Sequence, residues 1–486
     1  MTDTLVVDTA LGALRGRAVP GGGRVFAGIP FAAPPVGRRR FRPPGPPEPW
    51  RGVRDAGRFA AAPAQGVSAL MGEENTKSSF PGFPTASLGE TSEDCLYLNV
   101  WTPPAGGPRP VIVWIYGGGY EAGSAAPPYT DGAALARGTG AVVVAANYRL
   151  GALGFLHLAD LGGETNLALQ DQAAALRWVR DNIAAFGGDP GNVTVAGQSA
   201  GAYSVGALLA TPAAAGTFHK AILQSGSTFR GFDRATATAV AEDLLAALGL
   251  DGPEALRTVP LERILAAQSG VVDGDIGRRN LPGGRSWGAV VDGEVLPTIP
   301  HRAVVEGGVA AVPLLIGVNR DEVRLFQTIA GDRFAPGGEA DLLAEMRRAG
   351  VPDPAGVLDA YRASGLDLPS MRSAFLTDAI YRVPAARLAR DQVAAGGRAY
   401  HYEFRDEPCG PVMGAFHGAE LLYVFDKLAE AGADSPERLA VRDELLGAWA
   451  AFAADGDPGW PVFGGAGEGV SQAFGDASAS SGVRSP

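Results

Sequence analysis

Residues 193–201 read Val-Thr-Val-Ala-Gly-Gln-Ser-Ala-Gly, and an Ala-rich apolar stretch follows them. The β-branched beginning favours a buried strand, and the apolar continuation favours a helix. Between them lies Gly-x-Ser-x-Gly, which is typical of a sharp strand-to-helix turn that presents a serine hydroxyl above a sheet. Gly197 and Gly201 leave room for a strained backbone and for close strand–helix packing. The stretch therefore predicts Ser199 as a nucleophile in an α/β protein.

The same pattern occurs a second time, at residues 284–288. This match follows Pro-Gly-Gly rather than a strand, and Val-Val-Asp-Gly comes after it in place of a helix. Because the turn needs a strand before it and a helix after it, we interpret the second match as a loop.

Apolar runs of strand length recur on both sides of Ser199. A continuous apolar run bounded by Pro or Gly is typical of a strand buried on both faces. Residues 166–186 show a helical period that ends at two glycines. Strands that alternate with helices predict a mostly parallel, twisted central sheet with helices on both faces. The clearest expected strands are 96–101, 111–116, 141–146, 193–196, 221–224, 312–318 and 399–404.

We expect a single catalytic domain over residues 1–486. The stretches 232–300 and 327–395 are helical in pattern and fall between core strands, so they are interpreted as insertions that wall the site. Residues 65–92 lack periodicity and resemble a long functional loop. The Gly/Ser/Ala-rich tail over 464–486 is expected to fray.

Composition excludes several classes of partner. The chain is 46% hydrophobic and 19% charged, as in ordinary globular proteins. Its net charge of −11 argues against nucleic acid, which requires clustered basic residues. Neither a signal peptide nor an apolar run of about 18 residues is visible, so no membrane partner is expected. Cys95 and Cys409 are the only cysteines, which favours a reduced, cytoplasmic protein. The oligomeric state stays open.

Three glycines, 117–119, come directly after the expected strand 111–116. Acyl transfer places negative charge on a carbonyl oxygen, and backbone N–H groups must converge on it. In this kind of fold one N–H comes from the residue after the nucleophile, here Ala200, and others come from the early glycine loop. The glycines therefore predict an oxyanion hole.

The general base should be a histidine that follows the nucleophile and the acid along the chain. Four of the five histidines follow Ser199, and we compare the three that lie furthest along the chain, His301, His401 and His417. His401 lies in an alternating strand pattern, and His301 lies at an apparent helix start. His417 lies in a loop after the last clear strand, where it could reach over the edge of the sheet. We therefore favour His417.

The acid should end a core strand between Ser199 and His417. The strand 312–318 is followed by Asn-Arg-Asp-Glu. Periodicity does not distinguish Asp321 from Glu322, and Asp292 is a weaker third candidate.

Seven further segments carry a family resemblance. They are Phe-Ala-Gly-Ile-Pro-Phe-Ala from residue 26, Ser-Glu-Asp-Cys-Leu-Tyr-Leu-Asn-Val-Trp from 92, Trp-Ile-Tyr-Gly-Gly-Gly-Tyr from 114, Asn-Tyr-Arg-Leu-Gly-Ala-Leu-Gly-Phe-Leu from 147, Ala-Leu-Gln-Asp-Gln from 168, Phe-Gly-Gly-Asp-Pro from 186 and Gln-Ser-Gly-Ser from 224. From about residue 5 to about 475, the chain resembles the type B carboxylesterases. This branch of the α/β-hydrolases includes para-nitrobenzyl esterases and cholinesterases.

The resemblance implies a triad of Ser199 as nucleophile, Glu322 as acid and His417 as base. It favours Glu322 over Asp321 because the family's acid is the second member of its Asp-Glu pair. The resemblance also implies the remaining parts of the site: an oxyanion hole of Gly118, Gly119 and Ala200, and Ser225 as a hydrogen-bonding neighbour of the acid.

The chain departs from the family pattern at several positions. Gln198 replaces the family's Glu before the nucleophile, and Val323 replaces the usual glycine after the acid. No tryptophan lies between residues 50 and 101, where cholinesterases place an aromatic platform for a cation. A residue near Ala64 replaces the family's disulfide partner of Cys95.

These observations predict a serine carboxylesterase that cleaves uncharged small-molecule esters through an acyl-enzyme, without metal or organic cofactor. A carbamate or amide hydrolase, or an acyltransferase, could use the same triad. A non-catalytic binding module on this fold is the third possibility, and such relatives usually lack the nucleophile.

Overall fold

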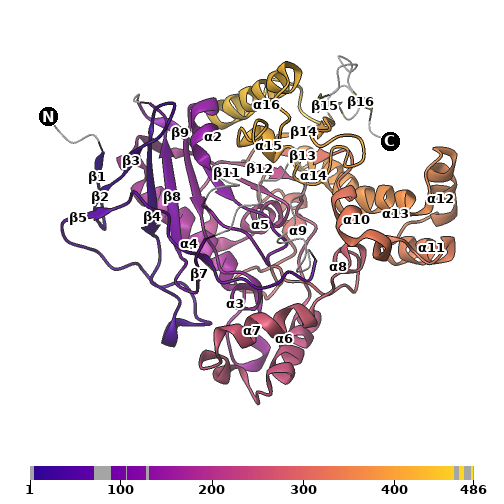
Figure 1. The fold of residues 1–486 in the computed structure, drawn as a ribbon, viewed down its shortest axis with the longest axis horizontal. Helices are drawn as coiled ribbons and strands as arrows, with labels where there is room; N and C mark the ends of the chain where they lie inside the picture. The colour runs from indigo at the N-terminus through magenta and orange to yellow at the C-terminus, as the bar shows by residue number, and fades with distance from the viewer. Residues whose placement is uncertain are drawn as a thin grey trace.

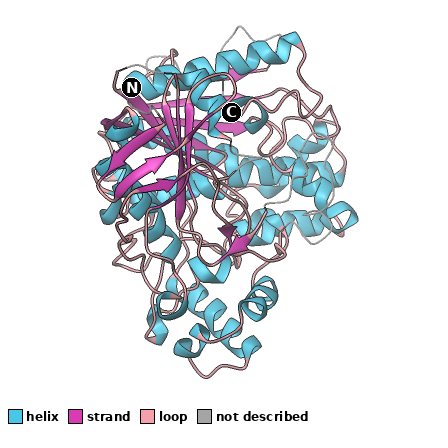
Figure 2. Ribbon diagram, turned by 60° about the vertical axis from the view of Figure 1, so that its left-hand side comes forward, coloured by secondary structure: helices cyan, strands magenta, loops and turns pink. Residues whose placement is uncertain are grey.

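One large sheet forms the centre of the structure, and helices cover both of its faces (Figure 1, Figure 2). The computed structural model describes residues 5–70, 89–104, 107–126, 131–464, 470–475 and 483–484. The sheet has eleven strands among these residues. In spatial order they are β16 (Val483–Arg484), β15 (Val470–Phe474), β14 (Ala399–Phe404), β13 (Leu314–Asn319), β12 (Lys220–Gln224), β11 (Gly188–Gln198), β9 (Arg109–Ile115), β10 (Val142–Ala146), β8 (Tyr97–Thr102), β4 (Arg24–Pro30) and β3 (Arg17–Ala18).

The middle of this sheet is parallel, as the alternation of strands and helices predicts. Every neighbouring pair from β10 through β15 runs parallel. The strands outside this block, β8, β4 and β3 on one side and β16 on the other, join it antiparallel. All residues of β10 and β12 are buried, which explains the continuous apolar sequence of β10 and the apolar centre of β12. The strand predicted over 312–318 begins at Leu314, because Pro313 has no N–H to donate to a ladder.

Helices on the two faces bury these strands. The helices α2 (Gly132–Thr139) and α16 (Pro436–Asp455) pack against each other on one face. The other face is covered by α4 (Leu167–Asn182), α5 (Ala200–Leu208) and α14 (Val383–Ala394). The expected helix over 166–186 is α4 followed by a single 3₁₀ segment.

The two predicted insertions are helical, and they extend from the sheet at the lower and right-hand parts of Figure 1. The first contains α6 (Arg234–Leu248), η5 (Pro253–Arg257), α7 (Leu261–Gln268), η6 (Ser269–Val271), α8 (Ile276–Asn280) and α9 (Pro300–Val305). The second contains α10 (Arg324–Ala330), η7 (Gly331–Phe334), α11 (Glu339–Arg348), α12 (Pro354–Ala363), α13 (Leu368–Thr377), the π-helical turn η8 (Asp378–Arg382) and α14.

The remaining elements are short. They are β1 (Val6–Thr9), β2 (Gly12–Arg15), β5 (Val53–Asp55), β6 (Ala62–Pro63), β7 (Thr91–Ser92), η1 (Gly37–Arg39), α3 (Gly151–Phe155), η2 (Ala159–Leu161), η3 (Ile183–Phe186), η4 (Pro212–Ala214) and α15 (Leu421–Val424). Among the described helices, none combines the length and the apolar character that crossing a bilayer requires.

Two expectations about loops fall partly outside the described residues. Of the long loop predicted over 65–92, residues 71–88 lie outside them. Of the tail expected to fray over 464–486, residues 465–469, 476–482 and 485–486 lie outside them. The described parts of that tail include β15, which pairs with β14 in the central sheet rather than fraying.

Candidate active site

Ser199 lies at the junction of β11 and α5, where the strand turns sharply into the helix. Its backbone has φ 56° and ψ −124°, a conformation that costs energy for any residue other than glycine. A Cβ on Gly201 would collide with the carbonyl oxygen of Ile115, and one on Gly197 would collide with the backbone of Gly201. The two glycines are therefore required by close backbone packing, and they hold the strained serine in place.

The glycine loop lies directly against this turn. A Cβ built on Gly117 would stand 3.0 Å from the Cβ of Ser199. Gly118 has φ 109°, and a side chain there would collide with the carbonyl oxygen of Ala122. The sequence Gly-Gly-Gly thus allows the loop to fold tightly beside the serine.

Three backbone N–H groups at this place are available to a ligand. Within the described part of the chain, no residue accepts a hydrogen bond from the N–H of Gly118, Gly119 or Ala200. Ala200 begins α5, so its N–H belongs to the first turn of a helix, where backbone donors have no partner within the helix. The three predicted oxyanion-hole residues therefore keep free donors, and they lie on the serine turn and on the glycine loop next to it.

His417 and Glu322 form a close, buried pair. The distance from His417 Nδ1 to Glu322 Oε2 is 2.6 Å, and the backbone N–H of His417 donates to the carbonyl oxygen of Glu322 at 3.2 Å. The other carboxylate oxygen accepts a bond from the N–H of Asn319 at 2.8 Å. Since a carboxylate can only accept, the proton of the imidazole is assigned to Nδ1, and Nε2 is left as an acceptor.

The free Nε2 of His417 faces Gln198 in this structure. The two Nε2 atoms are 3.3 Å apart, and Gln198 is buried. The hydroxyl of Ser199 makes no hydrogen bond with a described residue. Proton transfer from Ser199 therefore requires His417 to exchange the amide of Gln198 for the serine hydroxyl. Catalytic hydrogen bonds are often incomplete without substrate and tighten when it binds.

The other two candidate histidines are occupied elsewhere. His401 is buried in β14 with Nδ1 2.7 Å from Ser471 Oγ, and burial lowers its pKa to about 4. His301 lies between Thr228 Oγ1 and Asp391 Oδ2, each 2.9 Å from one of its ring nitrogens. Neither contacts Ser199 or Glu322 in the described structure.

The alternative acids and the second serine motif have structural partners as well. Asp321 accepts bonds from Arg320 Nε at 2.9 Å and from the N–H of Ala415 at 3.1 Å. Asp292 accepts from two backbone N–H groups of its own turn. Ser286, in the second Gly-x-Ser-x-Gly, lies in a loop and donates to the carbonyl oxygen of Trp287 at 3.0 Å.

Ser225 lies just after β12 and is buried. It has φ 53°, and its N–H donates to the carbonyl oxygen of Gly317 at 2.8 Å. Its hydroxyl has no hydrogen-bond partner among the described residues. The expected bond to the acid is thus absent from this structure, and the role of Ser225 stays a prediction.

Asn319 and Glu420 belong to the site but were not found by sequence reasoning. The side-chain amide of Asn319 donates to the carbonyl oxygen of Phe416 at 2.7 Å and to the carboxyl group of Glu420. Burial, and then the negative charge of Glu322, raise the pKa of Glu420 to about 7. Asn319 is the first residue of the Asn-Arg-Asp-Glu segment, but no sequence signal links it to residues about a hundred positions later.

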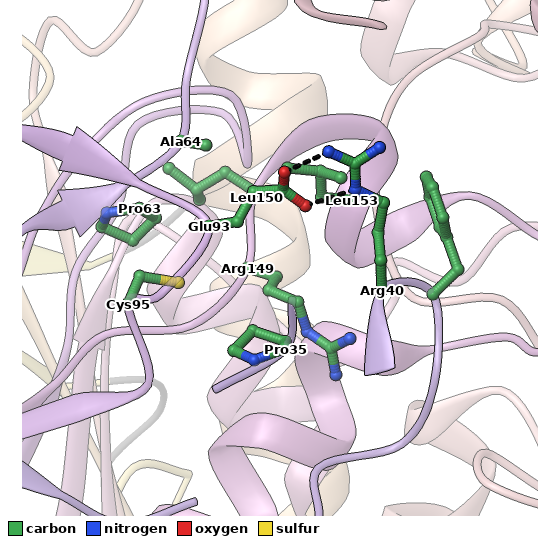
Figure 3. A pocket seen from close by; sticks show the side chains of 10 residues that line it. Pro35, Arg40, Pro63, Ala64, Glu93, Cys95, Arg149, Leu150 and Leu153 are labelled. Carbon is green, nitrogen blue, oxygen red and sulfur yellow. Dashed lines mark hydrogen bonds and ion pairs between the residues drawn. The ribbon is translucent and has the colours of Figure 1, made fainter. Parts of the chain in front are cut away.

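The environment of Cys95 also agrees with the sequence analysis. Both cysteines are free thiols, and Cys95 is buried. Cys95 and Ala64 line one small pocket, which is closed on one side by an ion pair between Arg40 and Glu93 (Figure 3). Ala64 therefore lies in the surroundings of the Cys95 thiol.

The sequence of this chain is similar to those of known proteins. The sequence matches the carboxylesterase family over residues 3–353 and 356–471. It is 37% identical to the para-nitrobenzyl esterase of Bacillus subtilis (strain 168), over 94% of this chain and 92% of that protein. It is 36% identical to the fumonisin B1 esterase of Sphingopyxis macrogoltabida, over 94% of this chain and 84% of that protein.

The fold of this chain is also similar to the folds of solved structures. The fold is similar to the crystal structure of a carboxylesterase from Geobacillus stearothermophilus, with a TM-score of 0.82 and 38% identity. The match covers 97% of this chain and 96% of that one.

Proposed function

The chain belongs to the carboxylesterase family and is a carboxylic ester hydrolase of the α/β-hydrolase fold, and from this premise we propose that Ser199, His417 and Glu322 carry out its reaction. The observation that carries the assignment is the 2.6 Å contact between His417 Nδ1 and the buried carboxylate of Glu322, close to the strained turn that holds Ser199.

The reaction proceeds in two halves. His417 Nε2 takes the proton of Ser199 Oγ while Oγ attacks the ester carbonyl carbon. The tetrahedral intermediate then loses the alcohol, which leaves with the proton returned by His417. Water, deprotonated by the same nitrogen, attacks the acyl-enzyme; Oγ leaves with that proton, and the acid is released. Glu322 orients the imidazole and stabilises its cation during each half.

The N–H groups of Gly118, Gly119 and Ala200 are proposed to hold the oxyanion. Each is free of a described partner, and each lies at the turn or at the glycine loop packed against it. Removal of one donor of an oxyanion hole typically costs about 3 kcal/mol of transition-state stabilisation.

The location of the enzyme, the kind of substrate and the domain organisation are also proposals. Two free cysteines and the alanine beside Cys95 support a reduced, cytoplasmic location. The net charge of −11 supports a small-molecule substrate rather than nucleic acid. We treat residues 1–486 as one catalytic domain.

The assignment is tested with Ser199→Ala and Glu322→Gln on 4-nitrophenyl acetate. Ser199→Ala is expected to lower kcat by about 10⁶, and Glu322→Gln by about 10⁴. A fluorophosphonate should label the wild type on the peptide that contains Ser199, as read by mass spectrometry. Retention of full activity by Ser199→Ala, or labelling of another serine, contradicts the proposal.

A further inference from the structure

Arg230 lies in the segment between β12 and α6 and is enclosed by aromatic rings. Its guanidinium carbon is 5.0 Å from the ring centre of Tyr203 and 5.5 Å from that of Phe232. Tyr203 is one helical turn after Ser199 on α5, and its N–H donates to the carbonyl oxygen of Ser199 at 3.0 Å. The guanidinium of Arg230 therefore lies over the ring of a residue on α5, the helix that follows the nucleophile.

The positive charge of Arg230 has no described carboxylate to balance it. Among the described residues, its one hydrogen bond runs from Nη2 to the hydroxyl of Ser286 at 3.0 Å. The charged or polar groups that act on it are Tyr203, Tyr120, Tyr381 and a second arginine, Arg279, and burial lowers the pKa of its guanidinium. A cation whose only described contacts are rings and one hydroxyl keeps N–H donors that a ligand could use.

Other buried arginines of the chain are compensated. Arg279 lies 2.7 Å from Glu121, and both side chains are sealed from solvent. Arg149 forms a two-point contact with Asp171 in the same manner. Arg230 differs from both: it is half-buried, and most of the donors on its planar fork have no described partner.

Tyr203 connects Arg230 to the neighbourhood of the catalytic histidine. The Tyr203 hydroxyl donates to the carbonyl oxygen of Ile380 at 3.2 Å, and the ring centre of the next residue, Tyr381, lies 5.0 Å from that of His417. Arg279 Nη2 donates to the carbonyl oxygen of Gly119 at 2.9 Å, so it lies behind the oxyanion loop. Of the two arginines, Arg279 is paired with Glu121, whereas Arg230 has N–H groups without a described partner that a ligand could use.

We propose that Arg230 binds a carboxylate on the substrate, so that the enzyme prefers esters carrying a free carboxylate, such as half-esters of dicarboxylic acids. A planar guanidinium accepts a carboxylate through two parallel N–H bonds. The proposal rests on the proposed function. It differs from the expectation of an uncharged ester, which followed from the low charge content and the apolar insertions, and the ester pairs below distinguish the two.

The test compares matched pairs of esters on the wild type and on variants. The acyl-side pair is 4-nitrophenyl hydrogen adipate and its neutral methyl ester; the alcohol-side pair is 4-acetoxybenzoate and its methyl ester. The readout is the ratio of kcat/KM for the anionic ester to that for the neutral one. The variants are Arg230→Met, Arg230→Lys and, as a matched control, Arg387→Met, since Arg387 also lies over an aromatic ring but is exposed.

The wild-type ratio is expected to exceed one for at least one pair and to fall in 0.5 M NaCl. Arg230→Met should lower this ratio at least tenfold, Arg230→Lys should lower it less, and Arg387→Met should leave it within twofold. The pair that responds identifies the side of the substrate that carries the anion. A wild-type ratio below one in both pairs, or a ratio unchanged by Arg230→Met, overturns the proposal.

If Arg230→Met fails to fold, inhibition of the wild-type enzyme tests the proposal instead. Adipate should inhibit hydrolysis of the neutral ester at a concentration at least tenfold below that required for adipamide, and equal inhibition overturns the proposal. Ser199→Ala distinguishes a failure of the carboxylate site from a failure of the proposed triad: it should abolish turnover of both members of each pair. Persistent turnover contradicts the proposed triad whatever the ratio is.

Discussion

The identity of residue 198 decides what the resting His417 contacts. The amide of Gln198 can donate to the unprotonated Nε2, whereas a carboxylate at that position cannot donate. A carboxylate would instead attract the imidazolium that forms when His417 takes a proton. The chain therefore keeps a neutral neighbour where its family carries a charged one.

We expect Gln198→Glu to move the acid limb of the kcat/KM profile toward higher pH by about 1 unit. The physical reason is that the added negative charge favours the protonated, inactive form of His417. The measurement is a pH series from 5 to 9 on a neutral ester. Gln198→Ala is the control: it removes the amide without adding charge, so its acid limb should move less than that of Gln198→Glu. An unmoved limb in Gln198→Glu would show that residue 198 does not act on the base.

At the scale of elements, close packing of α5 on β9 sets the geometry of the turn. A methyl group on Gly201 would meet the carbonyl oxygen of Ile115, which belongs to β9 and is held by the sheet. Gly447, in the interior of α16, has open space around its Cα. The two glycines thus offer a matched pair on different helices.

Gly201→Ala is expected to destabilise the protein by about 3 kcal/mol or to prevent folding, because backbone must move to admit the methyl group. Gly447→Ala should stabilise it by about 1 kcal/mol, since alanine is the better helix former. Urea unfolding followed by circular dichroism measures both. Equal effects of the two substitutions would refute the packing argument.

The sequence predicts features that lie within one element or between neighbouring elements. The strand–glycine–serine–glycine–helix order, the glycine loop and the parallel sheet follow from local patterns, and the structure confirms the fold. The choice between Asp321 and Glu322 did not follow from periodicity, because both end the same strand. The contacts of Asn319 with Phe416 and Glu420 join segments about a hundred residues apart, and no local pattern carries such information.

Arg230 shows a second limit of sequence reasoning. Its neighbours come from α5, from the segment after β12 and from the loop around Ser286. The net charge of −11 is a sum over the whole chain, so it carries no information about the charge around Arg230. Likewise, the composition of the tail suggested fraying, although β15 pairs with the central sheet.

For the whole molecule, the buried Glu420 links stability to pH. Its pKa is raised from 4.5 to about 7 in the folded protein, so the folded state keeps a proton that the unfolded chain loses. Stability from this group is therefore intact at low pH, declines as pH rises above about 4.5, and is fully lost above about 7.

We expect Glu420→Gln to stabilise the protein relative to wild type by up to about 3 kcal/mol at pH 8, and to have little effect at pH 5. Glutamine keeps an acceptor for the Asn319 amide without the cost of a buried charge. Urea midpoints at the two pH values measure the difference. Glu262→Gln, at an exposed position, serves as the control and should show no such pH dependence. A gain at pH 5 equal to that at pH 8 would contradict the linkage.

Within the helical excursions, α6 packs on α7, and α11 packs on α12 and α13, while the catalytic turn is fixed by backbone contacts inside the sheet. This separation makes the molecule suited to laboratory evolution by segment exchange. Libraries that recombine these excursions between homologous esterases should yield many folded chimeras with altered selectivity, whereas randomisation around the serine turn should yield few.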